Sequence, residues 1–207
     1  MKILSHRGYW KEEAEKNTIE AMRRSFSLGF GTETDVRDYN GDLFISHDIA
    51  DENAISFQKF LEIYGEYSKD LPLALNIKSD SLQLKLKEAL ARNKIENYFL
   101  FDMSIPDALG YLRNEVKNVF TRQSEYEKDP SFYEKANGVW LDSFEGDWFD
   151  NNLISAHLAK GKMVCIVSPE LHKRSHLESW KKYKFLSTEK NLFLCTDFPE
   201  EAREFFN

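Results

Sequence analysis

Residues 71–93 show in one stretch the pattern that decides the fold. Residues 71–78 read LPLALNIK, a short apolar run that ends in polar residues. Residues 82–93 read LQLKLKEALARN, where apolar residues recur at the spacing of an α-helix. A buried strand followed by a helix is the unit from which parallel sheets are built, with a right-handed crossover to the next strand.

The same unit recurs along the whole chain, in both directions from this stretch. Strands are predicted at Lys2–Arg7, Gly31–Arg37, Leu71–Lys78, Tyr98–Met103, Asn118–Arg122, Gly138–Asp142, Lys162–Val167 and Asn191–Thr196. Helices are predicted at Thr18–Leu28, Phe57–Tyr67, Leu82–Asn93, Pro106–Asn114, Ser131–Lys135, Asn151–Lys160, Leu177–Lys184 and Glu200–Phe206. Eight such units predict an α/β protein that closes as a (β/α)8 barrel, or TIM barrel. No linker divides the 207 residues, so we expect one compact domain, residues 1–207.

One feature departs from the simple alternation. Residues 38–47 read DYNGDLFISH, in which Asn40-Gly41 separates two strand-like runs. Asn-Gly in that position is typical of a tight hairpin turn. We therefore expect a small β-hairpin after the second strand, which returns His47 toward the mouth of the barrel.

Composition excludes several classes of function. The chain has 28 Lys and Arg against 35 Asp and Glu, a net charge of −7, which disfavours nucleic-acid binding. No apolar run reaches the ~18 residues of a membrane-spanning helix, and the N-terminal residues lack the pattern of a signal peptide, so we expect a cytoplasmic protein. The only two cysteines, Cys165 and Cys195, lie in apolar runs and are expected in the core. Nothing in the sequence indicates an oligomeric state.

Polar residues gather where the predicted strands end, which is where the active site of such a barrel lies. Glu33 and Asp35 are two residues apart on one strand, so both carboxylates point to the same side. Their oxygens suit a hard divalent cation, Mg²⁺ or Ca²⁺. The alternative is a pair neutralised by a salt bridge to Arg7 or Lys78.

Two histidines and three basic residues occupy similar places. His6 and His47 could act as an acid and base pair, because imidazole titrates near neutral pH. Arg7, Lys78 and Arg122 supply the positive charge that a phosphate group requires. Singly, each of these residues could equally be a structural hydrogen-bond or salt-bridge partner.

Taken in order, these residues form a recognisable series of motifs. They are HRG at 6–8, NT at 17–18 opening a helix, ETDV at 33–36, NG at 40–41, HD at 47–48 and TDFP at 196–199. The series resembles the glycerophosphodiester phosphodiesterase family, which belongs with the phosphatidylinositol-specific phospholipase C-like barrels. The N-terminal motifs cover about 45 residues, whereas the middle of the chain matches only in architecture.

The resemblance implies cleavage of a small-molecule phosphodiester with a divalent metal ion, Mg²⁺ or Ca²⁺. It implies that His6 and His47 are the general acid and base, that Arg7 contacts the phosphate, and that Lys78 is the basic residue two places beyond the third metal ligand. Lys78 and, from its place at a strand end, Arg122 are the further candidates for phosphate binding. The resemblance also implies that Glu33, Asp35 and Asn76 occupy the three metal-ligand positions. The hydroxyl that attacks phosphorus could come from water or from the substrate itself, which would give a cyclic phosphate.

Four departures from the family pattern stand out. Asn76 replaces the third metal-binding Glu, and Lys16 replaces the Glu of the helix start. The usual insertion after His-Asp is almost absent, and the seventh strand lacks the family's Trp. Substrate selection would then fall to other residues near the mouth, for which Trp10, Glu170 and His172 are the candidates.

A second hypothesis is a catalytically weak or inactive barrel that binds a phosphorylated ligand. Asn76 and Lys16 favour it, because both reduce the negative charge around a metal ion. The retained histidine pair favours the enzyme. A metal-free sugar isomerase is a more distant alternative, since the fold alone does not fix the chemistry.

Overall fold

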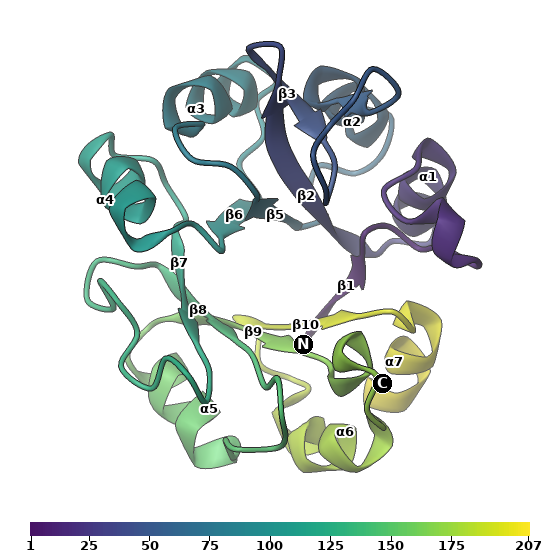
Figure 1. Ribbon diagram of the computed structural model, residues 1–207. Helices are drawn as coiled ribbons and strands as arrows, with labels where there is room; N and C mark the ends of the chain where they lie inside the picture. Colours follow the sequence, from purple (N-terminus) through teal and green to yellow (C-terminus); the bar gives the residue numbers. More distant parts are fainter.

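The computed structural model describes all 207 residues, which form a ring of strands surrounded by helices (Figure 1). The ring contains eight parallel strands, in agreement with the predicted barrel. They are β1 (Lys2–His6), β2 (Gly31–Tyr39), β5 (Leu73–Ile77), β6 (Tyr98–Phe101), β7 (Phe120–Gln123), β8 (Gly138–Leu141), β9 (Met163–Val167) and β10 (Leu192–Thr196). The last strand, β10, pairs in parallel with β1, so the two ends of the chain lie side by side in the sheet.

Neighbouring strands of the ring differ in how many residues they pair over. Strands β2 and β5 are paired over five residues, from Thr32 opposite Leu73 to Val36 opposite Ile77. Between β6 and β7, in contrast, there is a single bridge, Leu100 opposite Val119. This seam is therefore the part of the barrel with the fewest backbone hydrogen bonds between neighbouring strands.

Seven α-helices cover the outside of the ring. They are α1 (Ile19–Ser27), α2 (Phe57–Gly65), α3 (Gln83–Arg92), α4 (Ile105–Arg113), α5 (Asn151–Ala159), α6 (Leu177–Tyr183) and α7 (Pro199–Phe206). Three short 3₁₀ segments, η1 (Glu13–Glu15), η2 (Pro169–His172) and η3 (Lys184–Leu186), complete the regular structure. No helix of the structure has both the length and the apolar character needed to span a bilayer.

The prediction of a helix at Ser131–Lys135 is wrong. These residues form turns, and an irregular loop joins β7 to β8 between α4 and α5 (Figure 1). Five residues are little more than one helical turn, which is too short to offset the cost of nucleating a helix. Phe132 also has a φ of 57°, which is incompatible with a right-handed helix.

The hairpin predicted after the second strand is present. Strand β2 continues to Tyr39 and pairs antiparallel with β3 (Asp42–Ile45). Asn40 and Gly41 both have positive φ, as a two-residue hairpin turn of this kind requires. A further strand, β4 (Ile55–Ser56), pairs with β3; at two residues it is too short to produce a periodic signal in the sequence.

Aromatic side chains fill the inside of the barrel. The rings of Phe101 and Trp140 stack at 3.7 Å between centroids, and those of Phe99 and Phe120 at 4.0 Å. Cys165 and Cys195 are buried among them as free thiols, which confirms their expected place in the core. The packed side chains leave no channel through the barrel, and they form the bottom of the mouth.

Candidate active site

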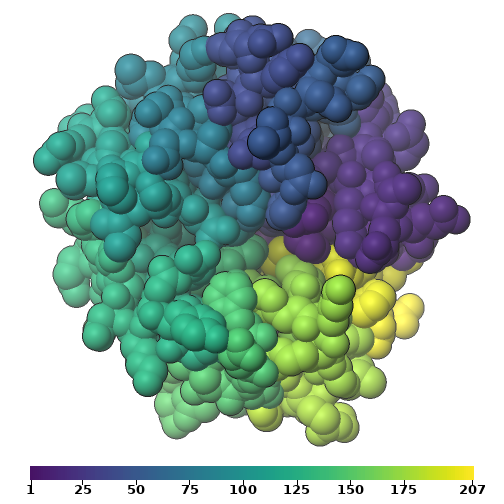
Figure 2. Space-filling view, viewed as in Figure 1, coloured from purple at the N-terminus to yellow at the C-terminus, as the bar shows by residue number.

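On several strands the inward-facing positions change from apolar to polar toward the carboxyl end. On β1, Leu4 belongs to the barrel core and His6 lies two residues further along; on β8, Trp140 and Asp142 have the same relation. Because side chains two residues apart share a face of a strand, His6 and Asp142 point into the mouth above that core. Figure 2 shows a hollow near the centre of this face, where the purple N-terminal segment meets the green and yellow C-terminal segments.

His6 is held by a carboxylate from the other end of the chain. Its Nδ1 lies 2.7 Å from Oδ1 of Asp197, just beyond β10. Its Nε2 lies on the side of Glu33, 3.9 Å from Oε2. Since a carboxylate only accepts hydrogen bonds, Nδ1 carries the proton and Nε2 is left free in the neutral ring. In the sequence, Asp197 stands at a strand end and in the TDFP motif, but nothing local marks it as the partner of His6.

Glu33 and Asp35 are both buried and lie on the same face of β2. Burial, followed by the nearby charge of Asp35, raises the pKa of Glu33 to about 7, against the opposing effect of His6, Arg7 and Lys78. Asp35 is closely neutralised: its Oδ2 is 3.0 Å from Nε of Arg7, and its Oδ1 is 3.5 Å from Nζ of Lys78. The cluster therefore combines buried negative charge with two cations on its rim.

The loop after β1 positions Arg7 and a further residue, Asn17. The Arg7 backbone N–H donates to the carbonyl of Glu33, and Asn17 N–H donates to the carbonyl of Arg7. The amide of Asn17 donates to Oδ2 of Asp35 at 2.9 Å and accepts from the hydroxyl of Thr34 at 2.8 Å. Asn17 thus orients Asp35, a role that its place in the motif did not specify.

Gly8 makes this loop possible. Its φ is +82°, and a Cβ there would lie 2.9 Å from the backbone of Ala21 in α1. A larger residue would therefore be strained and would clash with the helix. The glycine of the first motif lets the residue before it, Arg7, lie against Asp35.

The first wall of the mouth has oxygen atoms suited to a divalent cation. We use this name for a group of residues on β1, β2 and β5 or directly after these strands: His6, Arg7, Glu33, Asp35, Asn76 and Lys78. Asn76 lies directly opposite Asp35 in the strand register. Oδ1 of Asp35 and Oδ1 of Asn76 are buried and accept no hydrogen bond.

Buried oxygens that accept no hydrogen bond fit Mg²⁺ or Ca²⁺, which prefer carboxylate and amide ligands, although at Asp35 the ion would share Oδ1 with the ammonium group of Lys78, 3.5 Å away. A cation there would also offset the repulsion between Glu33 and Asp35. No cluster of three or more His, Cys, Asp or Glu side chains suited to a metal is present. The candidate set therefore includes the neutral amide of Asn76.

His47 lies at the rim and is not in contact with His6. Its side chain is 45% exposed, and its Nδ1 is 2.9 Å from Oδ1 of Asp48. It lines a cleft of about 520 Å³ that also includes Arg7 and lies between the start of α1 and the loop from Ser46 to Ile55. The structure thus brings His6 to the carboxylates and places His47 beside Arg7, at the outer end of the same region.

The second wall faces the first from β7, β8 and the loops beyond them. We use this name for Arg122, Asp142, Phe144 and His172. Nε2 of His172 is 2.7 Å from Oδ1 of Asp142, and the ring of Phe144 lies between His172, at 4.9 Å, and Arg122, at 5.9 Å. This wall offers an aromatic face with a polar group on each side.

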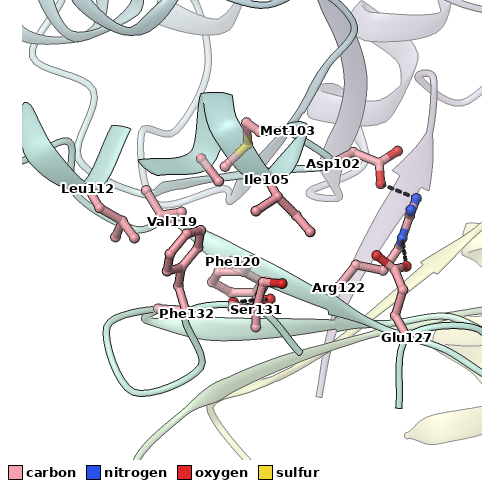
Figure 3. Close-up of a pocket in the computed structure, with 13 residues that line it drawn as sticks. Asp102, Met103, Ile105, Leu112, Val119, Phe120, Arg122, Glu127, Ser131 and Phe132 are labelled. Atoms are coloured by element: carbon pink, nitrogen blue, oxygen red, sulfur yellow. Dashed lines mark hydrogen bonds and ion pairs between the residues drawn. The ribbon is translucent and has the colours of Figure 1, made fainter. Parts of the chain in front are cut away.

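Arg122 is engaged by two carboxylates. Its guanidinium contacts Asp102 at 2.7 Å and also Glu127, at the polar end of a small apolar crevice along the β6–β7 seam (Figure 3). Asp102 in turn lies 3.8 Å from Nζ of Lys78, so ion pairs connect the two walls. A phosphate that reached Arg122 would have to displace Asp102 or Glu127.

The remaining candidates for substrate selection have different surroundings. Trp10 donates through its indole N–H to the carbonyl of His6 at 3.1 Å, and Nζ of Lys16 lies 4.5 Å above its ring. Glu170 is almost fully buried, and one of its carboxylate oxygens accepts a hydrogen bond from the backbone of Asp197. Of these candidates, His172 is the one that belongs to a wall of the mouth.

Comparison with known proteins identifies the fold. No protein-family model matches this sequence, and no curated protein sequence matches it. A solved structure from Galdieria sulphuraria, described as a glycerophosphodiester phosphodiesterase, superposes with a TM-score of 0.79 at 19% identity over 99% of this chain and 97% of that one. A glycerophosphodiester phosphodiesterase from Agrobacterium tumefaciens superposes with a TM-score of 0.71 at 14% identity over 99% of both chains.

These matches confirm the barrel fold that the motif resemblance implied. Phosphoribosyl anthranilate isomerase from Thermus thermophilus also superposes, with a TM-score of 0.54 at 12% identity over 100% of this chain and 96% of that one. The same architecture therefore serves unrelated reactions, and the activity of this chain has to be argued from its own residues.

Proposed function

We propose that this protein is a metal-dependent phosphodiesterase that cleaves a small glycerophosphodiester-like substrate. One observation carries the proposal: the residues of the motifs at 6–8 and 33–36 meet at one wall of the mouth, with His6 oriented by Asp197. Separately, these residue types are common at strand ends. Together they supply an oriented imidazole, buried ligand oxygens and two cations within one small region.

Arg7 and Lys78 would bind the phosphate group. Both side chains form ion pairs with Asp35, and both are partly exposed at the mouth. A phosphodiester gains negative charge on its nonbridging oxygens during cleavage, and fixed cations that stabilise this charge usually make the largest catalytic contribution. A divalent cation held by Glu33, Asp35 and Asn76 would supply further Lewis-acid stabilisation of the same oxygens.

His6 is suited to proton transfer because Asp197 fixes both its ring orientation and its tautomer. With Nδ1–H bonded to Asp197, the free Nε2 faces the buried carboxylates and can accept or return a proton. We assign His47 as the second group, in the cleft beside Arg7. One histidine would take the proton of the attacking hydroxyl, and the other would protonate the departing alkoxide as the P–O bond breaks.

The second wall and Trp10 would select the alcohol groups of the substrate. Phe144 and His172 offer an apolar face beside a polar ring nitrogen, opposite the proposed phosphate position. Arg122 would contribute only where a substrate displaces its carboxylate partners. A second candidate function, ligand binding without turnover, is favoured by the neutral Asn76 and by the pairing of Asp35 with two cations.

The test is a panel of phosphodiesters incubated with the protein and Mg²⁺, Ca²⁺ or Mn²⁺, with products followed by phosphorus NMR. We expect metal-dependent formation of a phosphomonoester or a cyclic phosphate, and the spectrum distinguishes the two. Chelator and Asp35→Asn should both abolish it. Thermal stabilisation by these compounds without any turnover would instead support the binding protein.

A further inference from the structure

Glu170, on η2 after β9, is a buried carboxylate that the proposed mechanism does not use. Its side chain is only 7% exposed. The nearest basic group is Nδ1 of His176, at 3.8 Å. A charge buried to this extent is stable only where hydrogen bonds replace its water. The groups that donate hydrogen bonds to Glu170 therefore indicate its role.

Three groups donate to this carboxylate. Oε1 accepts from the hydroxyl of Thr196 and from the backbone N–H of Asp197 at 3.1 Å, and Oε2 accepts from the hydroxyl of Ser168. The direction of the Ser168 bond is set by the indole N–H of Trp180, which donates to the same hydroxyl oxygen at 2.8 Å. This leaves the single Ser168 proton free for Glu170.

The same logic holds at Thr196, whose hydroxyl oxygen accepts from the backbone N–H of Phe198 at 3.0 Å. All three groups therefore donate to Glu170, two of them to Oε1 and one to Oε2. Glutamine at this position would direct its own N–H₂ group at one of these donors. The arrangement therefore suits a carboxyl group and not an amide.

These bonds fix the turn that carries Asp197. Two of them involve consecutive residues, Thr196 at the end of β10 and Asp197 directly after it. The side chain of Asp197 then reaches Nδ1 of His6 at 2.7 Å. Glu170 is thus connected to His6 through one intervening residue.

We propose that Glu170 is a positioning residue for the reaction. By holding the Thr196–Asp197 turn, it keeps Asp197 against Nδ1 of His6 and so keeps Nε2 of His6 directed into the mouth. This inference rests on the proposed function, because it assumes that His6 transfers a proton. It replaces substrate selection as the role of Glu170, whose carboxylate is turned toward the protein.

The kinetic test uses Glu170→Gln and Glu170→Ala. Loss of a group that orients a functional side chain typically costs about 10–100-fold in activity, and we expect this loss in kcat with KM changed by less than about twofold. The matched control is Glu178→Gln on α6, which makes the same chemical change at a side chain that is 76% exposed. Thr196→Val is a milder second variant, because it removes one donor and keeps the carboxylate.

A second measurement needs no turnover. In ¹⁵N spectra of the histidine rings at pH 8, wild-type His6 should show a protonated Nδ1 and an unprotonated Nε2. In the Glu170 variants, or in Thr196→Val if those do not fold, the two shifts should move toward each other as both tautomers become populated. Shifts identical to those of Glu178→Gln would overturn the proposal, as would moved shifts with unchanged kcat. If the wild type cleaves no phosphodiester, moved shifts still establish the positioning and the proposed function alone fails.

Discussion

The two walls of the mouth differ in how they are built. The first wall lies on β1, β2 and β5, where β2 and β5 pair over five residues and successive inward positions carry the functional groups. The second wall lies beyond the β6–β7 seam, which has one bridge, and two of its members lie outside the strands: Phe144 in the loop after β8 and His172 at the end of the 3₁₀ segment η2. Strand pairing sets the positions of the first wall, and Asp197 and Asn17 complete the orientation of His6 and Asp35. The second wall depends more on the packing of the segments that follow its strands.

This difference suits the first wall to the chemical step and the second wall to substrate selection. Proton transfer and charge stabilisation need groups held closely in place, which continuous strand pairing provides. Recognition of a substrate's outer groups tolerates more variation, and loops are where such variation usually lies.

Replacing one histidine on each wall should separate the two roles. We expect His6→Ala to lower kcat by about 10²–10⁴-fold, the usual range for loss of a general acid or base. His172→Ala should leave kcat within about tenfold of the wild type and should change KM differently for different substrates. Steady-state kinetics with two phosphodiesters decides this, and equal losses of kcat in both variants would remove the distinction between the walls.

Restoring a carboxylate to the first wall should tighten metal binding. A unit charge about 4 Å from a cation is worth roughly 4 kcal/mol at an effective dielectric near 20, before desolvation offsets part of it. We therefore expect Asn76→Glu to bind Mg²⁺ or Ca²⁺ about tenfold more tightly or better, and Asn76→Ala to bind more weakly. Titration calorimetry on the three proteins provides the affinities. Equal values would mean that Asn76 is not a ligand.

The seam should open more easily than the first wall. The amide of Leu100, which donates across the seam to Asn118, should exchange its hydrogen at least about fivefold faster in the native state than the amides of β5. Native-state hydrogen exchange by NMR measures both. Equal protection of the strand amides around the ring would show that the single bridge does not make the β6–β7 seam less stable than the other strand pairs.

The smallest effect concerns His157, behind the second wall. It is buried on α5, with Nδ1 2.7 Å from the hydroxyl of Tyr133 and Nε2 2.8 Å from Oε1 of Gln123. Burial, followed by the charges of Lys160 and Lys162, lowers the pKa of His157 below its usual 6.5.

Because the unfolded chain then binds a proton more readily, stability falls as pH drops below about 6.5 and levels off below the folded-state pKa. The loss cannot exceed about 1.4 kcal/mol per pH unit for one proton. Denaturant unfolding at pH 7, 6 and 5 should show a steeper loss for wild type than for His157→Gln. Parallel pH dependences would show that His157 is not the group responsible.

The sequence predicted most of what strand geometry determines. The eight strands, the Asn40-Gly41 hairpin and the convergence of Glu33 with Asp35 followed from apolar runs, turn residues and the two-residue repeat of a strand. The false helix at 131–135 arose because a short segment carries too little periodicity to exclude a turn.

Other features depend on contacts between distant parts of the chain. Asp197 and His6 are 191 residues apart in sequence and meet only because β10 pairs with β1. Asn17 could be assigned to a helix start, but its bond to Asp35 depends on how the loop after β1 folds back. The two carboxylates that contact Arg122 likewise come from Asp102, directly after β6, and from Glu127 in the irregular loop after β7, so this pairing could not be predicted from the local sequence.

The central claim is that the first wall holds the reacting phosphate. A crystal structure of the protein with Mn²⁺ and inorganic phosphate tests it most directly, because Mn²⁺ gives an anomalous signal. The account predicts one Mn²⁺ within ~2.0–2.6 Å of oxygens of Glu33, Asp35 and Asn76, with the phosphate bound by Arg7 and Lys78. A phosphate bound by Arg122 and His172, with no Mn²⁺ on the first wall, would contradict it.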